Sequence, residues 1–221
     1  MHADTTPLAS KSRSQELLAL LDWKRRIFEL YEEIRTASAP EVGWQRWREV
    51  RDELFRAHPQ SPVSNAMRES FAGLDYFPYD ASLRVLAEVV PADPLQTSIG
   101  ASGGETVVFE RFGQLSFELM GEKQALDLYW LEAYGGGIFL PFADATSGSE
   151  TYPAGRYLLD TVKGADLGSA GDRLVLDFNF AYNPSCAYDA HWVCPLAPPA
   201  NRLAVPVRSG ERRPQIVAGT A

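Results

Sequence analysis

The feature that most constrains the fold is a change in the spacing of apolar residues near Leu83. Before this point apolar residues recur at three- and four-residue steps, which places them on one face of a helix. After it, short runs rich in β-branched and aromatic residues alternate apolar with polar positions, as half-buried strands do. Leu126 and Leu128, for example, flank Asp127. The chain therefore begins with helices and continues as a sheet.

The helical region predicts an αα-hairpin arm over residues 12–58, preceded by a disordered tail at 1–11. Ser12 and Gln15 have the spacing of a capping box, and Ser38 and Glu41 repeat it before a second helix that ends near Ala57. The expected apolar face of the first helix is Leu17, Leu20, Leu21, Ile27, Phe28, Tyr31 and Ile34.

The β region spans residues 59–211, and 212–221 form a tail; together with the helical arm we expect one folded domain. Turn residues at 91–94, 112–113 and 135–137 separate short strands, and no helix lies between them, which argues against a parallel α/β sheet. The prediction is an α+β fold, mainly β: a helical hairpin packed on an antiparallel meander that curls into a barrel or sandwich. The proline-rich end of the chain is expected to wrap this core.

Composition narrows the classes of function. The chain has 21 Lys and Arg against 29 Asp and Glu, so its net charge is -8, and an acidic surface disfavours nucleic-acid binding. The N-terminus lacks the apolar segment of a secretory signal, and no run approaches the length of a membrane span. We therefore expect a cytoplasmic protein without a membrane partner. In that compartment a bridge between Cys186 and Cys194 is disfavoured.

A first group of candidate site residues lies in the loop between the strands that end at Phe142 and begin at Arg156. This loop is longer than a hairpin needs. Asp144 and Glu150 are candidates for a catalytic acid/base pair; alternatively, Asp144 caps a turn. An inward-pointing Arg156 must pair with a carboxylate of the protein or with an anionic ligand, so it is a candidate ligand-binding residue.

A second group follows the last strand. Asp177 and Asn179 share one face of that strand, and Asn183 stands where Pro184 ends it. These three residues, with Asn201 and Arg202 further along, have the side chains that a ligand pocket at the mouth of a β core requires. The alternative is that they bond to the backbone of the proline-rich wrap.

Cys186, His191 and Cys194 offer thiolate and imidazole ligands for a metal within nine residues. Structural zinc sites commonly use two pairs of ligands, and the chain has no second Cys pair. The spacing therefore argues against a metal, the simpler interpretation is two buried thiols, and no cofactor is expected. The segment 100–105 is glycine-rich but lacks the lysine of a phosphate-binding loop.

Several pieces of the sequence together resemble a prokaryotic family known only as domain of unknown function 1684. The pieces are Trp47-Arg48 with Arg51-Asp52, His58-Pro59 with Ser61-Pro62, Phe71–Leu74 with Tyr76-Phe77, Phe142–Tyr157, and Leu176–Cys186 continuing through Cys194–Leu196 and Asn201–Leu203 to Gly210-Glu211. The resemblance implies no activity. It implies that the long loop and the Asn-Pro-x-Cys region belong to one recurring arrangement, in which His191 is peculiar to this sequence.

Two functions are consistent with these patterns. The first is binding of a small anionic or polar metabolite at one end of the sheet, with or without hydrolysis. The second is a non-enzymatic interaction or homo-oligomerisation module that uses the N-terminal helices. The sequence does not decide whether the protein is an enzyme.

Overall fold

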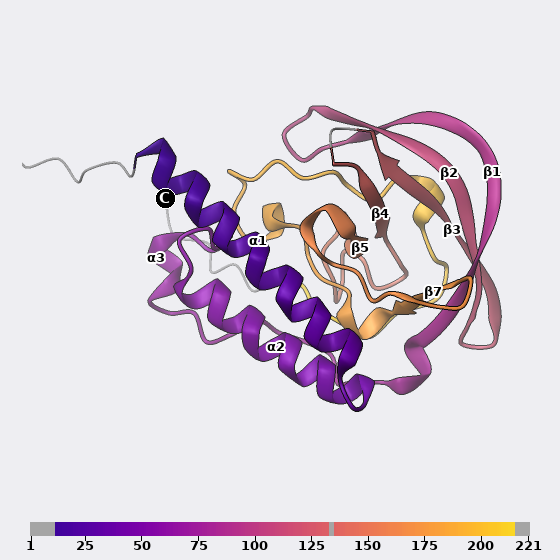
Figure 1. The fold of residues 1–221 in the computed structure, drawn as a ribbon, viewed down its shortest axis with the longest axis horizontal. Helices are drawn as coiled ribbons and strands as arrows, with labels where there is room; N and C mark the ends of the chain where they lie inside the picture. The colour runs from indigo at the N-terminus through magenta and orange to yellow at the C-terminus, as the bar shows by residue number, and fades with distance from the viewer. Residues whose placement is uncertain (1–11, 133–134, 215–221) are drawn as a thin grey trace, which may run out of the picture.

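The computed structural model describes residues 12–132 and 135–214. Two long helices, α1 (Arg13–Thr36) and α2 (Pro40–Ala57), form a hairpin along one side of a curled sheet (Figure 1). The capping box of α1 is confirmed, since Ser12 and Gln15 exchange hydrogen bonds of 3.1 and 3.3 Å. The second expected box is wrong, because α2 is preceded by Ala39 and has no side-chain cap. Of the expected tails, residues 1–11 and 215–221 lie outside the described residues.

Only the C-terminal half of α1 is buried, through Ile27, Leu30, Tyr31 and Ile34. The prediction that Leu17, Leu20, Leu21 and Phe28 are buried is wrong: all four are more than 40% exposed. For Leu17, Leu20 and Leu21 the reason is geometric, because the N-terminal half of α1 extends past the sheet (Figure 1). No helix in the described ranges is both long enough and apolar enough to cross a membrane.

The sheet is antiparallel and open. After the short helix α3 (Asn65–Arg68), its strands are β1 (Arg84–Gly100), β2 (Thr106–Leu119), β3 (Glu122–Leu131), β4 (Gly137–Phe142), β5 (Arg156–Asp160), β6 (Ser169–Ala170) and β7 (Arg173–Asp177). Their order is β5-β4-β3-β2-β1-β7-β6, with every neighbouring pair antiparallel. The edge strands β5 and β6 do not pair with each other in the described sheet, so the expected closure into a barrel does not occur.

Two of the predicted turns are β-bulges inside long strands. Residues 92–94 of β1 and Phe112 of β2 fall between paired stretches, and Pro91 stands opposite Gly113 where the bulges meet. Because the two bulges lie side by side, the paired strands β1 and β2 bend together at this point, and each strand continues beyond it without a turn. The buried face changes at the bend: Leu115 packs in the main cluster, whereas Phe109 packs in a second cluster.

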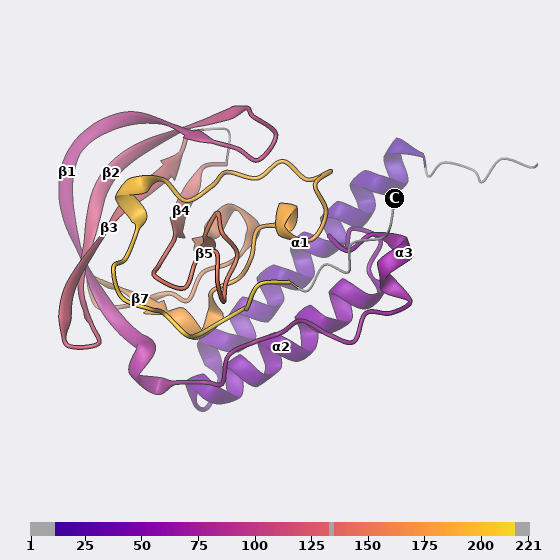
Figure 2. The same cartoon turned by 180° about the vertical axis from the view of Figure 1, so that it is seen from behind.

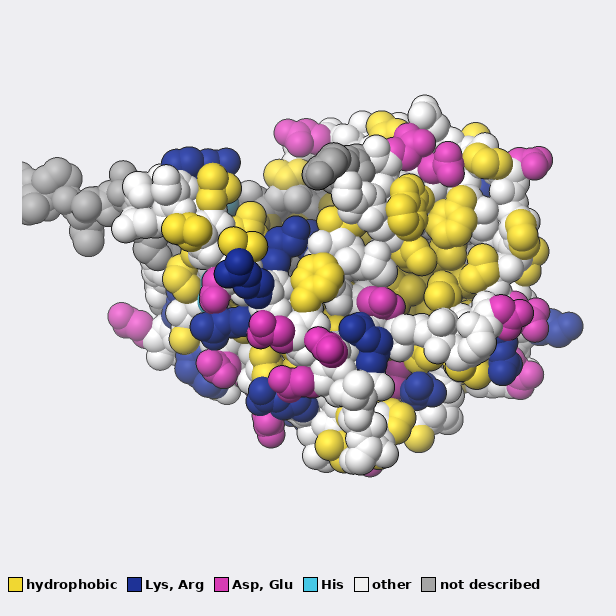
Figure 3. All heavy atoms as spheres, viewed as in Figure 1, with side chains coloured by type: hydrophobic (Ala, Val, Ile, Leu, Met, Phe, Trp, Pro, Cys, Tyr) yellow, Lys and Arg dark blue, Asp and Glu magenta, His cyan; other side chains and the backbone are white. Residues whose placement is uncertain are grey.

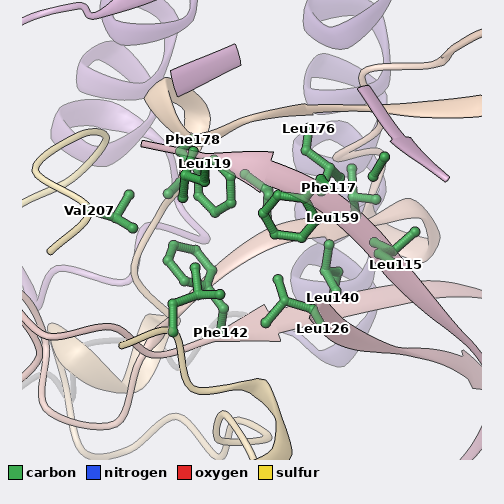
Figure 4. Packing of buried hydrophobic residues seen from close by; sticks show 14 of the residues in the cluster. Leu115, Phe117, Leu119, Leu126, Leu140, Phe142, Leu159, Leu176, Phe178 and Val207 are labelled. Atoms are coloured by element: carbon green, nitrogen blue, oxygen red, sulfur yellow. The ribbon is translucent and has the colours of Figure 1, made fainter. Parts of the chain in front are cut away.

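The C-terminal segment, residues 181–214, closes the core as predicted. In Figure 2 it crosses in front of β4 and β5 and returns towards the helices. Its apolar side chains, including Val205 and Val207, join the main cluster formed by the strands (Figure 4). The helices cover the other side, where Trp47 packs on Phe180 and Leu30 belongs to the same cluster. Trp47, which is 0% exposed, is therefore part of the core.

Candidate functional site

Arg156, the first residue of β5, is fully buried in a network of hydrogen bonds. Its side chain is 1% exposed, and its terminal nitrogens donate to four oxygens. One acceptor is Oδ2 of Asp144, 2.9 Å from Nη2. The other three are the backbone carbonyls of Val207, Ser209 and Glu211 in the C-terminal segment. The guanidinium charge is thus compensated within the protein, and it fastens the C-terminal segment to the sheet.

The two carboxylates proposed as an acid/base pair do not come together. Asp144 Oδ1 accepts from the backbone N–H of Thr146 at 2.7 Å and from its hydroxyl at 2.5 Å, so this side chain caps a turn. Glu150 instead lies in an exposed ion pair with Arg208, 2.9 Å away. The arrangement matches the alternative interpretation of this loop.

Asn201 and Arg202 have different surroundings in the structure: Asn201 is buried and Arg202 is not. The buried Asn201 side chain accepts from the backbone N–H of Asp127 at 2.9 Å and donates to the carbonyls of Asp127 and Pro141 at 3.0 and 2.7 Å. It thereby continues the hydrogen bonding between β3 and β4 beyond the point where the two strands stop pairing. Arg202 is exposed.

Asp177 and Asn179 lie together at the end of β7. Asp177 Oδ1 accepts from the backbone and side-chain nitrogens of Asn179 at 3.0 and 2.7 Å. Oδ2 has no hydrogen-bond partner in the described structure, since Arg84 Nε is 3.7 Å away. It borders a hollow of about 230 Å³ between the α1–α2 turn and β7. Burial raises the pKa of Asp177 to about 6.

We expect this buried carboxyl to make stability fall as pH rises from about 4 to about 6. The folded chain holds the Asp177 proton more tightly than the unfolded chain, whose carboxyl titrates near 3.9. Asp177→Asn keeps an oxygen for Asn179 and removes the titration. The variant should gain up to about 3 kcal/mol over wild type between pH 4 and pH 7.5 in urea unfolding. Asp75→Asn, at an exposed carboxylate, is the control; equal pH slopes for wild type and Asp177→Asn would contradict the expectation.

Asn183 borders a different hollow, which we call the helix–sheet cavity. It measures about 90 Å³ and lies between the helical hairpin and the sheet, with walls that include Tyr31, Arg51 and Tyr157. The backbone N–H of Asn183 donates to Glu211 Oε2 at 2.7 Å, and its side-chain nitrogen donates to the Arg212 carbonyl at 2.8 Å. Its side-chain oxygen is buried and has no partner among the described residues.

The charged centre of this cavity was not identified from the sequence. Arg51 is buried on α2, and both Nε and Nη2 donate to Oε1 of Glu211. The rings around its guanidinium are Trp47, Phe55 and Tyr182, at 4.9, 5.1 and 5.1 Å. A signal was available: Arg51 follows Trp47 by four residues, so it lies on the apolar face of α2, where an arginine needs a buried partner.

The hydroxyl of Tyr31 is the second unpaired polar group of the cavity. Tyr31 is buried on α1, and its hydroxyl lies near the indole N–H of Trp47 but makes no hydrogen bond of full geometry in the described chain. Burial raises the pKa of Tyr31 above its ordinary value, so the hydroxyl stays protonated and keeps its donor. An acceptor (Asn183) and a hydroxyl (Tyr31) therefore line one cavity without being used.

The thiols of Cys186 and Cys194 are buried and free, and Cys194 borders the helix–sheet cavity. His191 is exposed and its ring lies against Trp192, 5.9 Å away. Across residues 12–132 and 135–214, no three His, Cys, Asp or Glu side chains gather as a set of metal ligands. The three candidate ligands are therefore not assembled here.

Comparison with known proteins identifies relatives but no activity. Residues 69–212 match the family described as protein of unknown function (DUF1684). The solution NMR structure of an uncharacterized protein from Haloarcula marismortui is 38% identical, with a TM-score of 0.57, over 78% of this chain and 93% of that one. No curated protein matches the chain.

Proposed function

The chain belongs to DUF1684, a family of proteins of unknown function, and we propose that it binds a small polar molecule in the helix–sheet cavity. The observation that carries the proposal is the side-chain oxygen of Asn183, a buried acceptor without a donor beside a cavity. Buried polar groups are nearly always paired, and an unpaired one at a cavity is most simply completed by a ligand or water. The residue was also a candidate on sequence grounds.

The chemistry of the cavity defines the class of ligand. Arg51 is neutralised by Glu211, and Asp160 is paired with Lys163 at 3.2 Å, so the walls do not require a ligand with a net charge. The ligand must offer a donor to Asn183 and a group that can bond with the hydroxyl of Tyr31. A small amide or hydroxy compound meets both requirements, and the volume of about 90 Å³ admits only a few of its non-hydrogen atoms. Because Asp144 and Glu150 lie apart, we propose binding without hydrolysis.

A thermal-shift screen of small amides and hydroxy compounds, followed by calorimetry on the hits, tests this function. Tyr31→Phe removes a hydroxyl that makes no hydrogen bond of full geometry, so the variant should fold as wild type does while its affinity falls roughly tenfold, the effect of one lost hydrogen bond. Tyr129→Phe is the matched control, at a buried tyrosine in the second cluster of the sheet. Unchanged affinity in Tyr31→Phe, or no hit in the screen, would overturn the proposal.

The exposed half of α1 favours a second candidate function, self-association. Leu17 and Leu21 are 49 and 42% exposed and lie on one stripe of this half, and Phe28, 47% exposed, continues the stripe beyond Lys24. Figure 3 shows apolar side chains on this part of the surface, with basic side chains among them. A second copy of the chain brings an identical stripe, which suits a two-fold contact. Sedimentation equilibrium should find a dimer that Leu21→Glu dissociates and Leu18→Glu, off the stripe, does not. A monomer at all concentrations would rule this candidate out.

A further inference from the structure

The hollow beside Asp177 shares no lining residue with the helix–sheet cavity. Its volume is about 230 Å³, and its walls include residues 37–40, where α1 turns into α2, together with Arg35, Arg84 and Asp177. Since a water molecule occupies about 30 Å³ in the liquid, the hollow has room for about seven non-hydrogen atoms. Residues 38–40 are exposed, so a small molecule can reach the hollow from solvent.

The carboxyl of Asp177 is the unsatisfied acceptor of this hollow. Asp177 is 1% exposed, and the hydrogen bonds from Asn179 reach its Oδ1 only. Oδ2 has no hydrogen-bond donor in the part of the chain that the structure describes, since Nε of Arg84 is 3.7 Å away. A buried carboxylate oxygen without a donor is costly, and a cationic donor compensates its charge as well as its lone pairs. The hollow therefore favours a ligand that places an ammonium group at Oδ2.

The rest of the lining favours a negative charge. Arg35 and Arg84 bring two guanidinium groups, and Asp177 is the only carboxylate among the described residues that line the hollow. Nη1 of Arg35 donates to a neutral group, the backbone carbonyl of Asp166, at 2.7 Å. The hollow also borders the N-terminus of α2, which begins at Pro40 without a side-chain cap, and a helix N-terminus attracts anions. A carboxylate on the ligand therefore complements this side of the hollow.

We propose that this hollow is a second binding site, for the ammonium and carboxylate groups of a small α-amino acid. The ammonium group donates to Oδ2 of Asp177, and the carboxylate pairs with Arg35 and Arg84, which line the same hollow. One carbon joins the two groups of an α-amino acid, so both fit within room for about seven atoms. An α-hydroxy acid fits the same space but offers only a neutral donor to the buried carboxylate, so it binds more weakly. The site is independent of the ligand in the helix–sheet cavity.

The experiment titrates the full chain with L-alanine at pH 7.5, above the pKa of about 6 that burial gives Asp177, and follows the backbone amides by ¹H–¹⁵N NMR. L-Alanine should shift the amides of Ala37, Ser38 and Ala39 until they saturate. Ethylamine lacks the carboxylate, propionate lacks the ammonium group, and L-lactate has a hydroxyl in its place; each should bind at least tenfold more weakly. Equal affinity for L-alanine and any of these three, no saturable shift, or shifts confined to the helix–sheet cavity overturns the proposal.

Two variants test the residues without loss of folding. Asp177→Asn keeps the oxygen that Asn179 uses and is expected to be more stable than wild type at this pH, so weaker binding does not come from unfolding. It should bind L-alanine at least tenfold more weakly, and Arg35→Gln, at an exposed side chain, about threefold more weakly. Arg173→Gln is the matched control, at an exposed arginine of β7 outside the hollow. Wild-type affinity in Asp177→Asn or Arg35→Gln, or an equal loss in Arg173→Gln, overturns the proposal.

Discussion

Replacing Arg156 by methionine is expected to lower the free energy of unfolding by about 3–5 kcal/mol, a large share of the total for a domain of this size. The substitution removes the cation that compensates the buried Asp144 carboxylate. It also leaves the carbonyls of Val207, Ser209 and Glu211 without their donor, and buried acceptors without partners are costly. Urea unfolding followed by circular dichroism measures the loss.

Arg202→Met is the matched control, because Arg202 lies in the same C-terminal segment but is exposed. Its effect should stay within about 0.5 kcal/mol. The pair of variants also distinguishes the two interpretations of Arg156 that the sequence left open. If Arg156→Met were as stable as wild type but lost ligand binding, Arg156 would be a ligand-binding residue and the helix–sheet cavity would lose its priority as the candidate site.

The architecture could be predicted because it follows from local patterns. The change of period near Leu83 separates helices from strands, and the capping box at Ser12 fixes the start of α1. Long-range geometry was not predictable in this way. The predicted turns at 91–94 and 112–113 are bulges in two long strands, beside the paired position of Pro91 and Gly113. Leu17 is exposed because the N-terminal half of α1 extends past the sheet.

In the candidate site, too, local sequence patterns predicted part of the arrangement and long-range contacts decided the rest. The sequence left open whether Arg156 points inward, and whether an inward Arg156 pairs with a carboxylate of the protein or with a ligand; the structure buries Arg156 and pairs it with Asp144. The backbone carbonyls that accept the other hydrogen bonds of Arg156 belong to irregular backbone at residues 207–211. No repeating pattern in that part of the sequence predicts the direction in which those carbonyls point. The helix–sheet cavity was equally hidden, because it exists only where α2 brings Arg51 against Glu211, 160 residues away in sequence.

Substituting Glu211 by glutamine should also destabilise the fold by about 3–5 kcal/mol, since it breaks a buried ion pair and leaves the Arg51 cation without a counter-charge. Glu211 Oε2 additionally accepts from the Tyr188 hydroxyl at 2.6 Å and from the Asn183 backbone at 2.7 Å. An amide nitrogen at either position faces a donor. Chemical unfolding by circular dichroism and tryptophan fluorescence gives the loss and shows whether the two probes still agree.

Glu150→Gln supplies the comparison, because its ion pair with Arg208 is exposed and should contribute less than about 1 kcal/mol. The contrast tests how the helical hairpin is attached. Since Arg51 lies on α2 and Glu211 on the C-terminal segment, losing their ion pair weakens the contact between hairpin and sheet. We expect one cooperative transition at lower urea in Glu211→Gln. Two separate transitions, with the sheet as stable as in wild type, would instead show that the hairpin unfolds independently of the sheet. That result would favour the proposal that the hairpin serves self-association.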